Sequence, residues 1–354
     1  MDKIAVYGAS GFTGRLVVAE LLRRGVPLVA AGRDGERLRQ AAGGRPGAEV
    51  RVAGAGDPAA LAAAFDGCAA VINCVAPFEE FGEPVLRAAV SVGCHYVDTT
   101  GEQTYLKRVF DTFGEPARRR GVTVVPALAD DGGPGDLIAH LTAEALGPGA
   151  DLAVLTVADL RRPGGVSRGT ARTALANRRL WGGDGGLHWA DGAWRAGTVA
   201  RTETVPAPGA GAEPEAGELK VTAFALPGIV TVPRHVRARR VEAVMRAEVA
   251  PLFGALTEEV VAALPEGPDA GTRAAARWLM AAYATAADGR RAQGSVTGTD
   301  GYGLTAVIAV EGALRLVTGE VPPGVLAPAQ AFDPADFLTA LEPHGVRWSV
   351  LTPA

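Results

Sequence analysis

Cysteine, lysine and long apolar runs are all scarce in this sequence. Its three cysteines, Cys68, Cys74 and Cys94, match neither a CxxC metal motif nor a paired disulfide framework, and we interpret them as reduced thiols. The longest uncharged apolar runs, 67–78 and 301–310, are shorter than the ~20 residues that a membrane-spanning helix needs. No charged leader with a long apolar segment opens the chain. We therefore expect a cytoplasmic protein with no membrane span.

A basic excess is also missing. The 354 residues carry 35 Lys and Arg against 39 Asp and Glu, a net charge of −4, so nucleic acid is not an expected partner. An HExxH helix, a Walker GK[ST] motif and a Tyr-x-x-x-Lys pair do not occur, which disfavours metalloproteases, kinases and the short-chain dehydrogenase proton relay. No metal site is predicted.

The length and the 48% hydrophobic content indicate two globular domains. In the first third of the chain, short β-branched runs alternate with helical patterns, which predicts a Rossmann-type parallel sheet over residues 1–130. The predicted strands are 4–7, 26–31, 49–53, 70–75, 95–98 and 122–127, and the predicted helices are 16–24, 34–42, 58–65, 83–92 and 105–119.

Residues 131–354 change in character and predict an α+β domain with a mixed sheet for substrate binding or dimerisation, whose C-terminal segment packs back on the first domain. The low-complexity stretch 206–217 predicts a mobile surface loop. The predicted strands are 152–159, 218–225, 290–297, 305–311 and 346–351, and the predicted helices are 136–146, 170–180, 239–248, 272–285 and 333–341.

A glycine-rich turn between the first strand and the first helix is the strongest chemical signal. Its glycines permit a tight turn, a close approach of the backbone to a pyrophosphate, and close packing of helix on strand, while the amides of the helix N-terminus meet the phosphate charge. We predict a dinucleotide site formed by Gly8, Ser10, Gly11, Phe12, Thr13 and Gly14.

The end of the second strand indicates which dinucleotide binds. Arg33 stands about twenty residues after the glycines, where NAD enzymes place an acid for the ribose 2′-hydroxyl. A guanidinium binds a 2′-phosphate bidentately, so NADPH is the predicted cofactor. The alternative is that Arg33 is a solvated charge and Asp34 binds the ribose. Asp57, after the third strand, is predicted to bind the adenine edge, or else to cap a helix.

Turns after the fourth and fifth strands should surround the nicotinamide, because ligands of doubly wound sheets lie at the carboxyl ends of the strands. Cys74, Val75, Ala76 and Pro77 are predicted to form the floor beneath it, or simply a rigid turn. Asp98 and Glu102 are candidate catalytic residues that would bind substrate or deliver a proton. The alternative is that Thr99 or Thr100, followed by Glu102, only caps the start of the next helix.

Two segments of the second domain are candidates for substrate binding. Ser167, Arg168 and Thr170 open a predicted helix, where amides and a guanidinium would hold a carboxylate or phosphate, or where Thr170 would only cap the helix. Arg234 and His235 adjoin an apolar run and would face the cleft, although a lone histidine is more often a surface or packed residue.

Several segments together resemble the saccharopine dehydrogenase-like family, most closely its trans-acting enoyl reductase branch. They are GASGFTG (8–14), AGR (31–33), NCVAPFEEFGEPVLRAAVSVGCHYVDTTGE (73–102), SRGT (167–170), VTVPRHV (230–236) and PGVLAPAQAF (323–332). The resemblance implies a Rossmann domain with an inserted mixed-sheet domain, use of NADP(H), and reduction of a C=C or C=N bond. The family's Gly-Phe-Asp-Ser stretch is replaced by 128–134, LADDGGP, which leaves the substrate class open.

Our leading hypothesis is an NADPH-dependent reductase that transfers hydride to a C=C bond of a small or carrier-bound acyl intermediate in polyketide- or lipid-like biosynthesis. A second is an imine reductase or amino-acid dehydrogenase of saccharopine type, which convergence of Arg168, Arg172 and Arg234 on substrate carboxylates would favour. A third is a non-catalytic protein that senses NADP(H). A homodimer is expected from exposed sheet area in the second domain.

Overall fold

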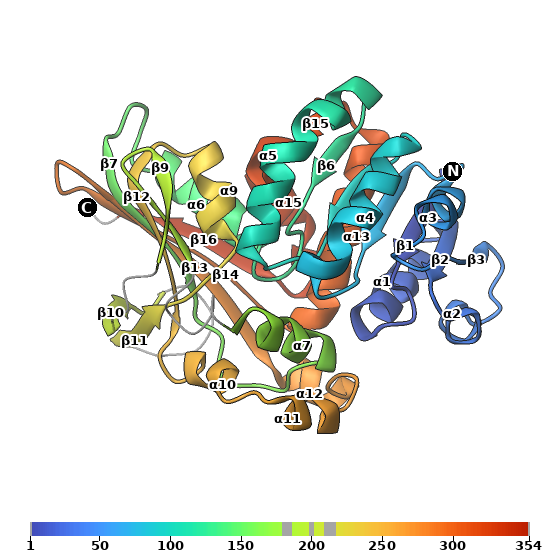
Figure 1. Cartoon of the computed structure of the whole chain (residues 1–354). Coiled ribbons are helices and arrows are strands. Elements are labelled where there is room, and N and C mark those ends of the chain that lie inside the picture. The colour runs from blue at the N-terminus through green and yellow to red at the C-terminus, as the bar shows by residue number, and fades with distance from the viewer. Residues whose placement is uncertain (1, 179–185, 198–201, 209–216, 353–354) are drawn as a thin grey trace.

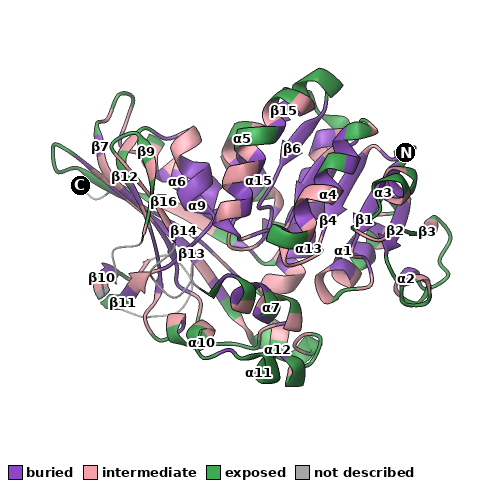
Figure 2. Ribbon diagram, viewed as in Figure 1, coloured by how far each residue is buried: buried purple, intermediate pink, exposed green. Residues whose placement is uncertain are grey.

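Two β-sheets organise the computed structural model, which describes residues 2–178, 186–197, 202–208 and 217–352. In Figure 1 the sheet that contains the N-terminal strands lies on the right and the second sheet on the left, with helices between them and below. The central strands of both sheets are largely buried, whereas exposed residues collect on edge strands, on helices and on loops (Figure 2).

The first sheet is entirely parallel, with the order β15-β6-β5-β4-β1-β2-β3. Strands β1, β2 and β4 are buried at every position, as expected where helices cover both faces. The order is that of dinucleotide-binding domains and confirms the predicted Rossmann fold. The strands are β1 Ile4–Tyr7, β2 Leu28–Gly32, β3 Ala48–Val52, β4 Ala70–Asn73, β5 His95–Asp98, β6 Thr123–Val125 and β15 Gly324–Val325.

Crossover helices connect these strands, and the order reverses between β1 and β4, where a crevice opens at the carboxyl ends of the strands. Each of these helices follows the strand that the sequence pattern placed before it. The helices are α1 Phe12–Arg23, α2 Gly35–Ala42, α3 Pro58–Phe65, α4 Phe78–Ser91 and α5 Gln103–Arg120.

The second sheet is mixed, as predicted: β12 and β7 are parallel and the other pairs antiparallel. Helix α6 (Gly133–Glu144) packs so tightly on it that a Cβ at Gly294 would lie 2.2 Å from the Thr142 hydroxyl. The strands are β7 Leu152–Asp159, β8 Leu187–Ala190, β9 Ala193–Ala196, β10 Thr202–Pro206, β11 Glu218–Ala223, β12 Ala238–Arg246, β13 Arg277–Ala286, β14 Arg291–Thr299 and β16 Arg347–Leu351.

The remaining helices of the described residues follow strands of the second sheet or connect it to the first. They are α7 Arg168–Ala176, α9 Gly228–Thr231, α10 Ala250–Gly254, α11 Glu258–Ala263, α12 Ala270–Ala275, α13 Gly301–Thr318, α14 Pro328–Ala331 and α15 Pro334–Ala340, with the 3₁₀ turns η1 Val232–Arg234 and η2 Glu342–His344. Of the predicted loop 206–217, residues 209–216 lie outside the described residues, and so do residues 179 and 180 at the end of the predicted helix 170–180.

Three predicted elements of the second domain are wrong. The expected helix 239–248 is strand β12, and most of the expected helix 272–285 is strand β13, because both are central strands whose pairing partners override the helix propensity of Ala, Met and Glu. The expected strand 305–311 lies inside helix α13. Its unbroken apolar run reflects a helix buried on most sides, which periodicity does not distinguish from a buried strand.

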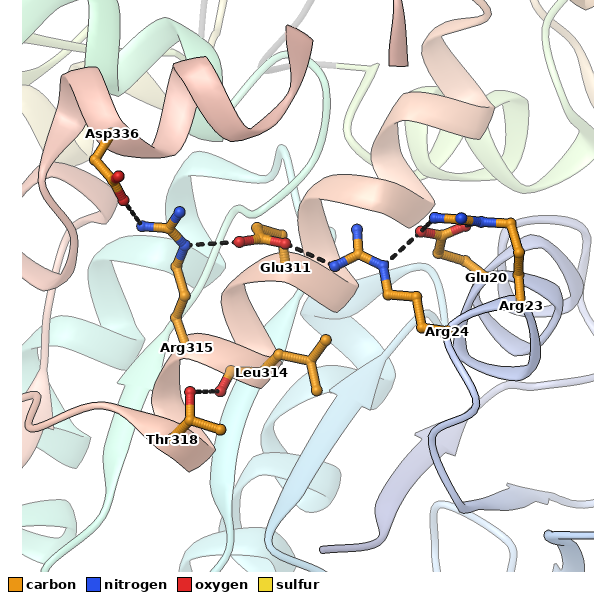
Figure 3. Close-up of polar contacts among 8 residues, drawn as sticks. All are labelled: Glu20, Arg23, Arg24, Glu311, Leu314, Arg315, Thr318 and Asp336. Atoms are coloured by element: carbon orange, nitrogen blue, oxygen red, sulfur yellow. Dashed lines mark hydrogen bonds and ion pairs between the residues drawn. The ribbon is translucent and has the colours of Figure 1, made fainter. Parts of the chain in front are cut away.

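The C-terminal segment returns to the first sheet. Strand β15 pairs with β6, and α13 packs against α1. A chain of ion pairs joins α1, α13 and α15 (Figure 3): Glu20 binds Arg24, Arg24 binds Glu311 at 2.6 Å, Glu311 binds Arg315, and Arg315 binds Asp336. Part of this network is shielded from water, since Glu20 is 9% and Glu311 18% exposed.

Helix α13 is also the one helix among the described residues that is long and apolar enough to cross a bilayer. It satisfies this criterion by length and composition only, and 56% of its apolar window is buried inside the protein. A buried core helix has the same properties, so the finding is weak evidence for a membrane span.

Candidate active site

The glycine-rich turn has the close contacts that its sequence predicts. Gly8 has φ +79°, and a Cβ there would meet the Cys74 and Val75 backbone at 3.2 Å. A Cβ at Gly14 would lie 2.1 Å from the Gly8 carbonyl oxygen, so only glycine lets α1 approach the turn this closely. The first amides of α1 have no side-chain cap. This leaves them able to bind a phosphate.

A cavity of about 1300 Å³ begins at this turn and extends into the second domain. Ser10, Gly11, Phe12 and Thr13 line it at the crevice between β1 and β4. The cavity is large enough for a dinucleotide and part of a substrate, since ligand sites typically enclose about 300–1,000 Å³.

At one end of the cavity, Arg33 and Arg37 follow strand β2. Arg33 is exposed on the cavity wall, where a 2′-phosphate would meet its guanidinium. Asp34 also lines the cavity, but its carboxylate accepts the Glu36 and Arg37 N–H groups as the cap of α2. This engagement weakens the alternative in which Asp34 binds the ribose.

Asp57 does not line the cavity. Its carboxylate accepts the N–H groups of Ala59 and Ala60 and caps helix α3. The structure therefore corrects its assignment as an adenine ligand in favour of the alternative, a helix cap. Gly54, Ala55 and Gly56, immediately before it, line the cavity instead.

The turn after β4 lies on the cavity wall, and Cys74, Val75, Ala76 and Pro77 all line it. Buried groups beneath hold this turn in place: the Asn73 side chain accepts the Val75 N–H and donates to the Tyr96 hydroxyl. Burial raises the pKa of the Cys74 thiol to about 12, so Cys74 is a packing residue and not a nucleophile.

The two acids proposed for catalysis after β5 are buried and do not line the cavity. Asp98 accepts the N–H groups of Thr100 and Ala127 and the Tyr105 hydroxyl, and burial raises its pKa to about 6. Glu102 accepts the N–H groups of Phe78 and Glu79, both at 2.8 Å, and so caps helix α4. Its catalytic assignment is corrected, because Pro77 at the N-cap has no side-chain acceptor and Glu102 supplies one.

Acidic residues that do face the cavity follow β6 and were not among the predicted site residues. Asp130 and Asp131 line it beside Asp159 and Arg161. Arg161 binds the Asp159 carboxylate through Nε at 2.6 and 2.8 Å and reaches Asp130 at 3.0 Å. Asp130 also accepts a hydrogen bond from the Thr305 hydroxyl. The signal for these residues was present, because LADDGGP follows the last central strand at the same sheet edge.

The second domain contributes Ser167, Arg168 and Thr170 to the cavity wall. Ser167 caps α7 through the Thr170 N–H, its own N–H donates to the Tyr302 hydroxyl, and Arg168 donates to the Leu264 carbonyl. The predicted residues thus come together. Their polar groups are nevertheless largely engaged with the protein.

Arg234 and His235 lie away from the cavity, and the expectation that they face substrate is corrected. The Arg234 guanidinium lies 3.7 Å from the centre of the Phe110 ring, and burial lowers its pKa to about 10. His235 lies 2.8 Å from Asp136 and 2.9 Å from His140 in a buried cluster beside α6. Both side chains pack the domain interior.

Apolar side chains form a further part of the cavity wall. They come from α7, α10, β12 and the segment after β11, and sequence analysis did not single them out because they read as ordinary core. They are Leu175, Phe224, Leu226, Met245, Val249, Leu252, Phe253 and Leu256. Leu252 is 52% exposed and the other side chains are buried or half-buried, so the apolar surface is open to a ligand at Leu252.

Two residues of the second domain, Glu266 and Gly267, contact helices α1 and α2 beside the glycine-rich turn. Glu266 binds Arg15 at 2.7 Å and Arg37 at 2.6 Å, and the Arg15 hydrogen bond leads the interactions that hold the pKa of Glu266 below its ordinary value. Gly267 lies so close that a Cβ would be 2.4 Å from the Phe12 ring. Sequence distance hides this contact, because Glu266 is 229 residues from Arg37.

Among the described residues, no group of three or more His, Cys, Asp or Glu side chains is placed to hold a metal ion. The acids nearest to that arrangement, Asp130 and Asp159, surround the guanidinium of Arg161 instead.

Comparisons with known proteins agree with this geometry. Residues 4–125 match the model of the saccharopine dehydrogenase NADP binding domain. A saccharopine dehydrogenase-like oxidoreductase of Rattus norvegicus is 31% identical over 153 residues, 38% of this chain and 36% of that protein. A Mycobacterium tuberculosis protein named as a trans-acting enoyl reductase is 29% identical over 140 residues, 38% of this chain and 33% of that protein.

The matches cover only part of these relatives, and the chain spans about a third of the length of the curated relatives it matches. A lipid droplet localized protein of Caenorhabditis elegans is 34% identical over 146 residues, 38% of this chain and 34% of that protein. Apo saccharopine dehydrogenase (L-Glu forming) from Saccharomyces cerevisiae has the same fold over 100% of both chains, with a TM-score of 0.66 at 15% identity.

Proposed function

Because residues 4–125 form a saccharopine dehydrogenase NADP-binding domain, we propose that this chain is an NADPH-dependent reductase of a C=C bond in an apolar acyl intermediate. The substrate would be an enoyl, polyketide- or lipid-like compound, small or bound to a carrier, in a biosynthetic pathway. NADPH supplies a hydride when bound. A relative named as an enoyl reductase is consistent with this choice of bond.

The observation that carries the proposal is the apolar wall of the cavity. Phe224, Leu226, Met245 and Phe253 face a space that also reaches the glycine-rich turn and the acids after β6. A ligand that spans this space meets hydrophobic side chains along one part and polar groups at the other. An acyl chain with a polarised double bond at one end has this distribution.

The arginines predicted to bind substrate carboxylates do not converge in the cavity, which supports an apolar substrate over an amino acid. A saccharopine-type substrate needs guanidiniums for its carboxylates, but Arg161 is neutralised by two aspartates and Arg168 donates to a backbone carbonyl. Arg234 is outside the cavity. Arg172 is exposed on the cavity wall, so the proposed convergence of three arginines reduces to one.

Different segments of this chain would bind different parts of NADPH. The amides of 10–14 would bind the pyrophosphate, Arg33 the 2′-phosphate, and the turn 74–77 would support the nicotinamide ribose. The fit rests on observed geometry: a cradle in which Cβ atoms at Gly8 and Gly14 would collide with backbone, and an exposed guanidinium at its far end.

The first experiment titrates the purified chain with NADPH and NADH by fluorescence, for the wild type, Arg33→Ala and Arg39→Ala. Arg39 is a matched exposed arginine that does not line the cavity. We expect tight NADPH binding that weakens at least ~10-fold in Arg33→Ala, about 1.4 kcal/mol, and is unchanged in Arg39→Ala. If neither nucleotide binds, the reductase proposal fails.

Turnover then separates the remaining alternatives. Trans-2-decenoyl N-acetylcysteamine thioester tests enoyl reduction, and 2-methyl-1-pyrroline tests imine reduction. NADPH oxidation by the imine alone favours the C=N alternative. Tight NADPH binding with no turnover of either favours a redox-sensing protein. The cytoplasmic location and the homodimer remain part of the proposal, and light scattering of the purified chain tests the dimer.

A further inference from the structure

The two acids after β6, Asp130 and Asp131, are adjacent in sequence but differ in their hydrogen-bond partners. Asp130 is bound by Arg161 and Thr305. In the part of the chain that the structure describes, the Asp131 carboxylate forms no hydrogen bond or ion pair with another residue. Its Oδ2 lies against Gly101, where a Cβ would be only 3.0 Å away, on the cavity wall formed by the ends of β5 and β6.

The balance of charges around Asp131 favours its protonated form. The carboxylates of Asp130, Asp131 and Asp159 lie near the guanidinium of Arg161. This guanidinium donates its hydrogen bonds to Asp130 and Asp159. Ionisation of Asp131 would add a second uncompensated negative charge to this cluster in a partly dehydrated site. Burial first, and then the Asp130 charge, raises the pKa of Asp131 to about 7.

Its position is suitable for chemistry. The nicotinamide end of a bound dinucleotide would be expected at the carboxyl ends of β4 to β6, and Asp131 follows β6 on that edge. The neighbouring acids of β5, Asp98 and Glu102, are fully buried and do not line the cavity. Asp131 is therefore a carboxyl that keeps its proton near neutral pH and opens onto the substrate space.

We propose that Asp131 is the catalytic acid that protonates the substrate in the reduction. This inference rests on the proposed function. Hydride addition to the β-carbon of the C=C bond leaves the electron pair as an enolate on the acyl group. The Asp131 O–H bond breaks, its proton forms the new α-C–H bond, and the carboxylate left behind takes a proton from water through the open cavity.

The first test does not depend on activity. Carboxyl ¹³C NMR of the full chain, with Asp131→Asn to assign the resonance, measures the titration of Asp131 directly. We expect a midpoint near pH 7. In Asp130→Asn the midpoint should fall by a unit or more, because the nearest like charge is gone and Arg161 is freed. A midpoint below 5 in the wild type would overturn the proposal.

The second test uses the decenoyl thioester in single turnovers. Asp131→Asn should lower the rate ~10²–10⁴-fold with the NADPH dissociation constant unchanged, since it removes only a proton donor. The wild-type rate should fall as pH rises through 7, and in Asp130→Asn this fall should occur at lower pH. The control is Asp66→Asn, an exposed aspartate away from the cavity.

The outcomes are distinguishable. A wild type that reduces the thioester while Asp131→Asn does so at the same rate and with the same pH profile overturns the role of Asp131 and leaves the proposed function intact. A wild type that binds NADPH but does not reduce the thioester overturns the proposed function, and the role of Asp131 with it. Unchanged NADPH affinity of Asp131→Asn also shows that the variant is folded.

Discussion

Replacing Gly14 with alanine tests the packing on which the cofactor site depends. The new Cβ would lie 2.1 Å from the Gly8 carbonyl oxygen, 2.8 Å from the Gly8 carbonyl carbon and 2.9 Å from Ala9 Cα. Ordinary contact begins near 3.4 Å, so α1 must retreat by about 1.3 Å, and every atom in the way is backbone. α1 is also tied to α13 through the Arg24–Glu311 ion pair.

The steric cost of Gly14→Ala exceeds the gain in helix propensity, so the variant should be less stable than the wild type. Overpacking costs about 1–3 kcal/mol, and often more where backbone must move, whereas alanine gains at most about 1 kcal/mol over glycine in a helix. We expect the free energy of unfolding to fall by about 2 kcal/mol in urea titrations followed by circular dichroism. NADPH should bind at least ~10-fold more weakly, since the amides that meet the phosphates move with α1.

Gly254→Ala is the matched control. Gly254 is also helical, but a Cβ there would have no neighbour within 4 Å, so its stability should change by no more than about 0.5 kcal/mol. If Gly14→Ala unfolds at the same urea concentration as Gly254→Ala and binds NADPH like the wild type, the close contact of α1 with the turn does not limit the site, and our reasoning is refuted.

Three further outcomes follow from named contacts. Glu102→Gln puts an amide NH₂ against an α4 N–H and should cost about 1–3 kcal/mol in urea unfolding; an unchanged midpoint would contradict the capping role. Burial raises the pKa of Asp98 from 3.8 to about 6, so between these values the folded state binds a proton that the unfolded state has lost. The free energy of unfolding should therefore fall by up to about 3 kcal/mol as the pH rises from 4 to 6. In Asp98→Asn this dependence on pH should be weaker. Glu266→Gln breaks exposed ion pairs and should change stability by less than about 1 kcal/mol. It also frees Arg37, which lines the cavity with Arg33 and would then be available to the 2′-phosphate, so NADPH should bind about 2–5-fold more tightly while NADH binding is unchanged. Equal effects on both nucleotides would contradict this interpretation of Arg37.

The first domain could be predicted closely because its signals are local. Strands β1 and β2 are continuous runs of four and five buried, largely apolar residues, and the caps Asp34 of α2 and Asp57 of α3 lie within three residues of the N–H groups that they accept. Glycine spacing at 8, 11 and 14 reports contacts inside a single strand-turn-helix unit. The fold and the dinucleotide turn therefore follow from short windows of sequence.

The second domain and the catalytic end could not be predicted in the same way, because their contacts are long-range. Strand β13 is alanine-rich and reads as a helix until its pairing with β7 and β14 is known. Glu102 looked like a general acid because nothing in its neighbourhood reveals that it caps α4, whose first residues lie 23 and 24 positions away. Arg161 and Asp130 are 31 residues apart and meet only across the two sheets.

The turns after β5 and β6 both contain acidic residues, but these residues have different roles. The number of hydrogen-bond donors around each carboxylate determines whether it is structural or catalytic. Asp98 and Glu102 after β5 each accept two backbone N–H groups, which fixes the turns that line the cavity and fills the positions from which a proton would be given. Within the described ranges of the chain, the Asp131 carboxylate after β6 accepts no such N–H group, and Asp130 and Asp159 bind the guanidinium of Arg161. A carboxyl with saturated acceptors is a structural group, whereas one that faces a cavity beside two other carboxyls holds a transferable proton. The search for catalytic acids in related folds should accordingly begin with the acid that lacks donors.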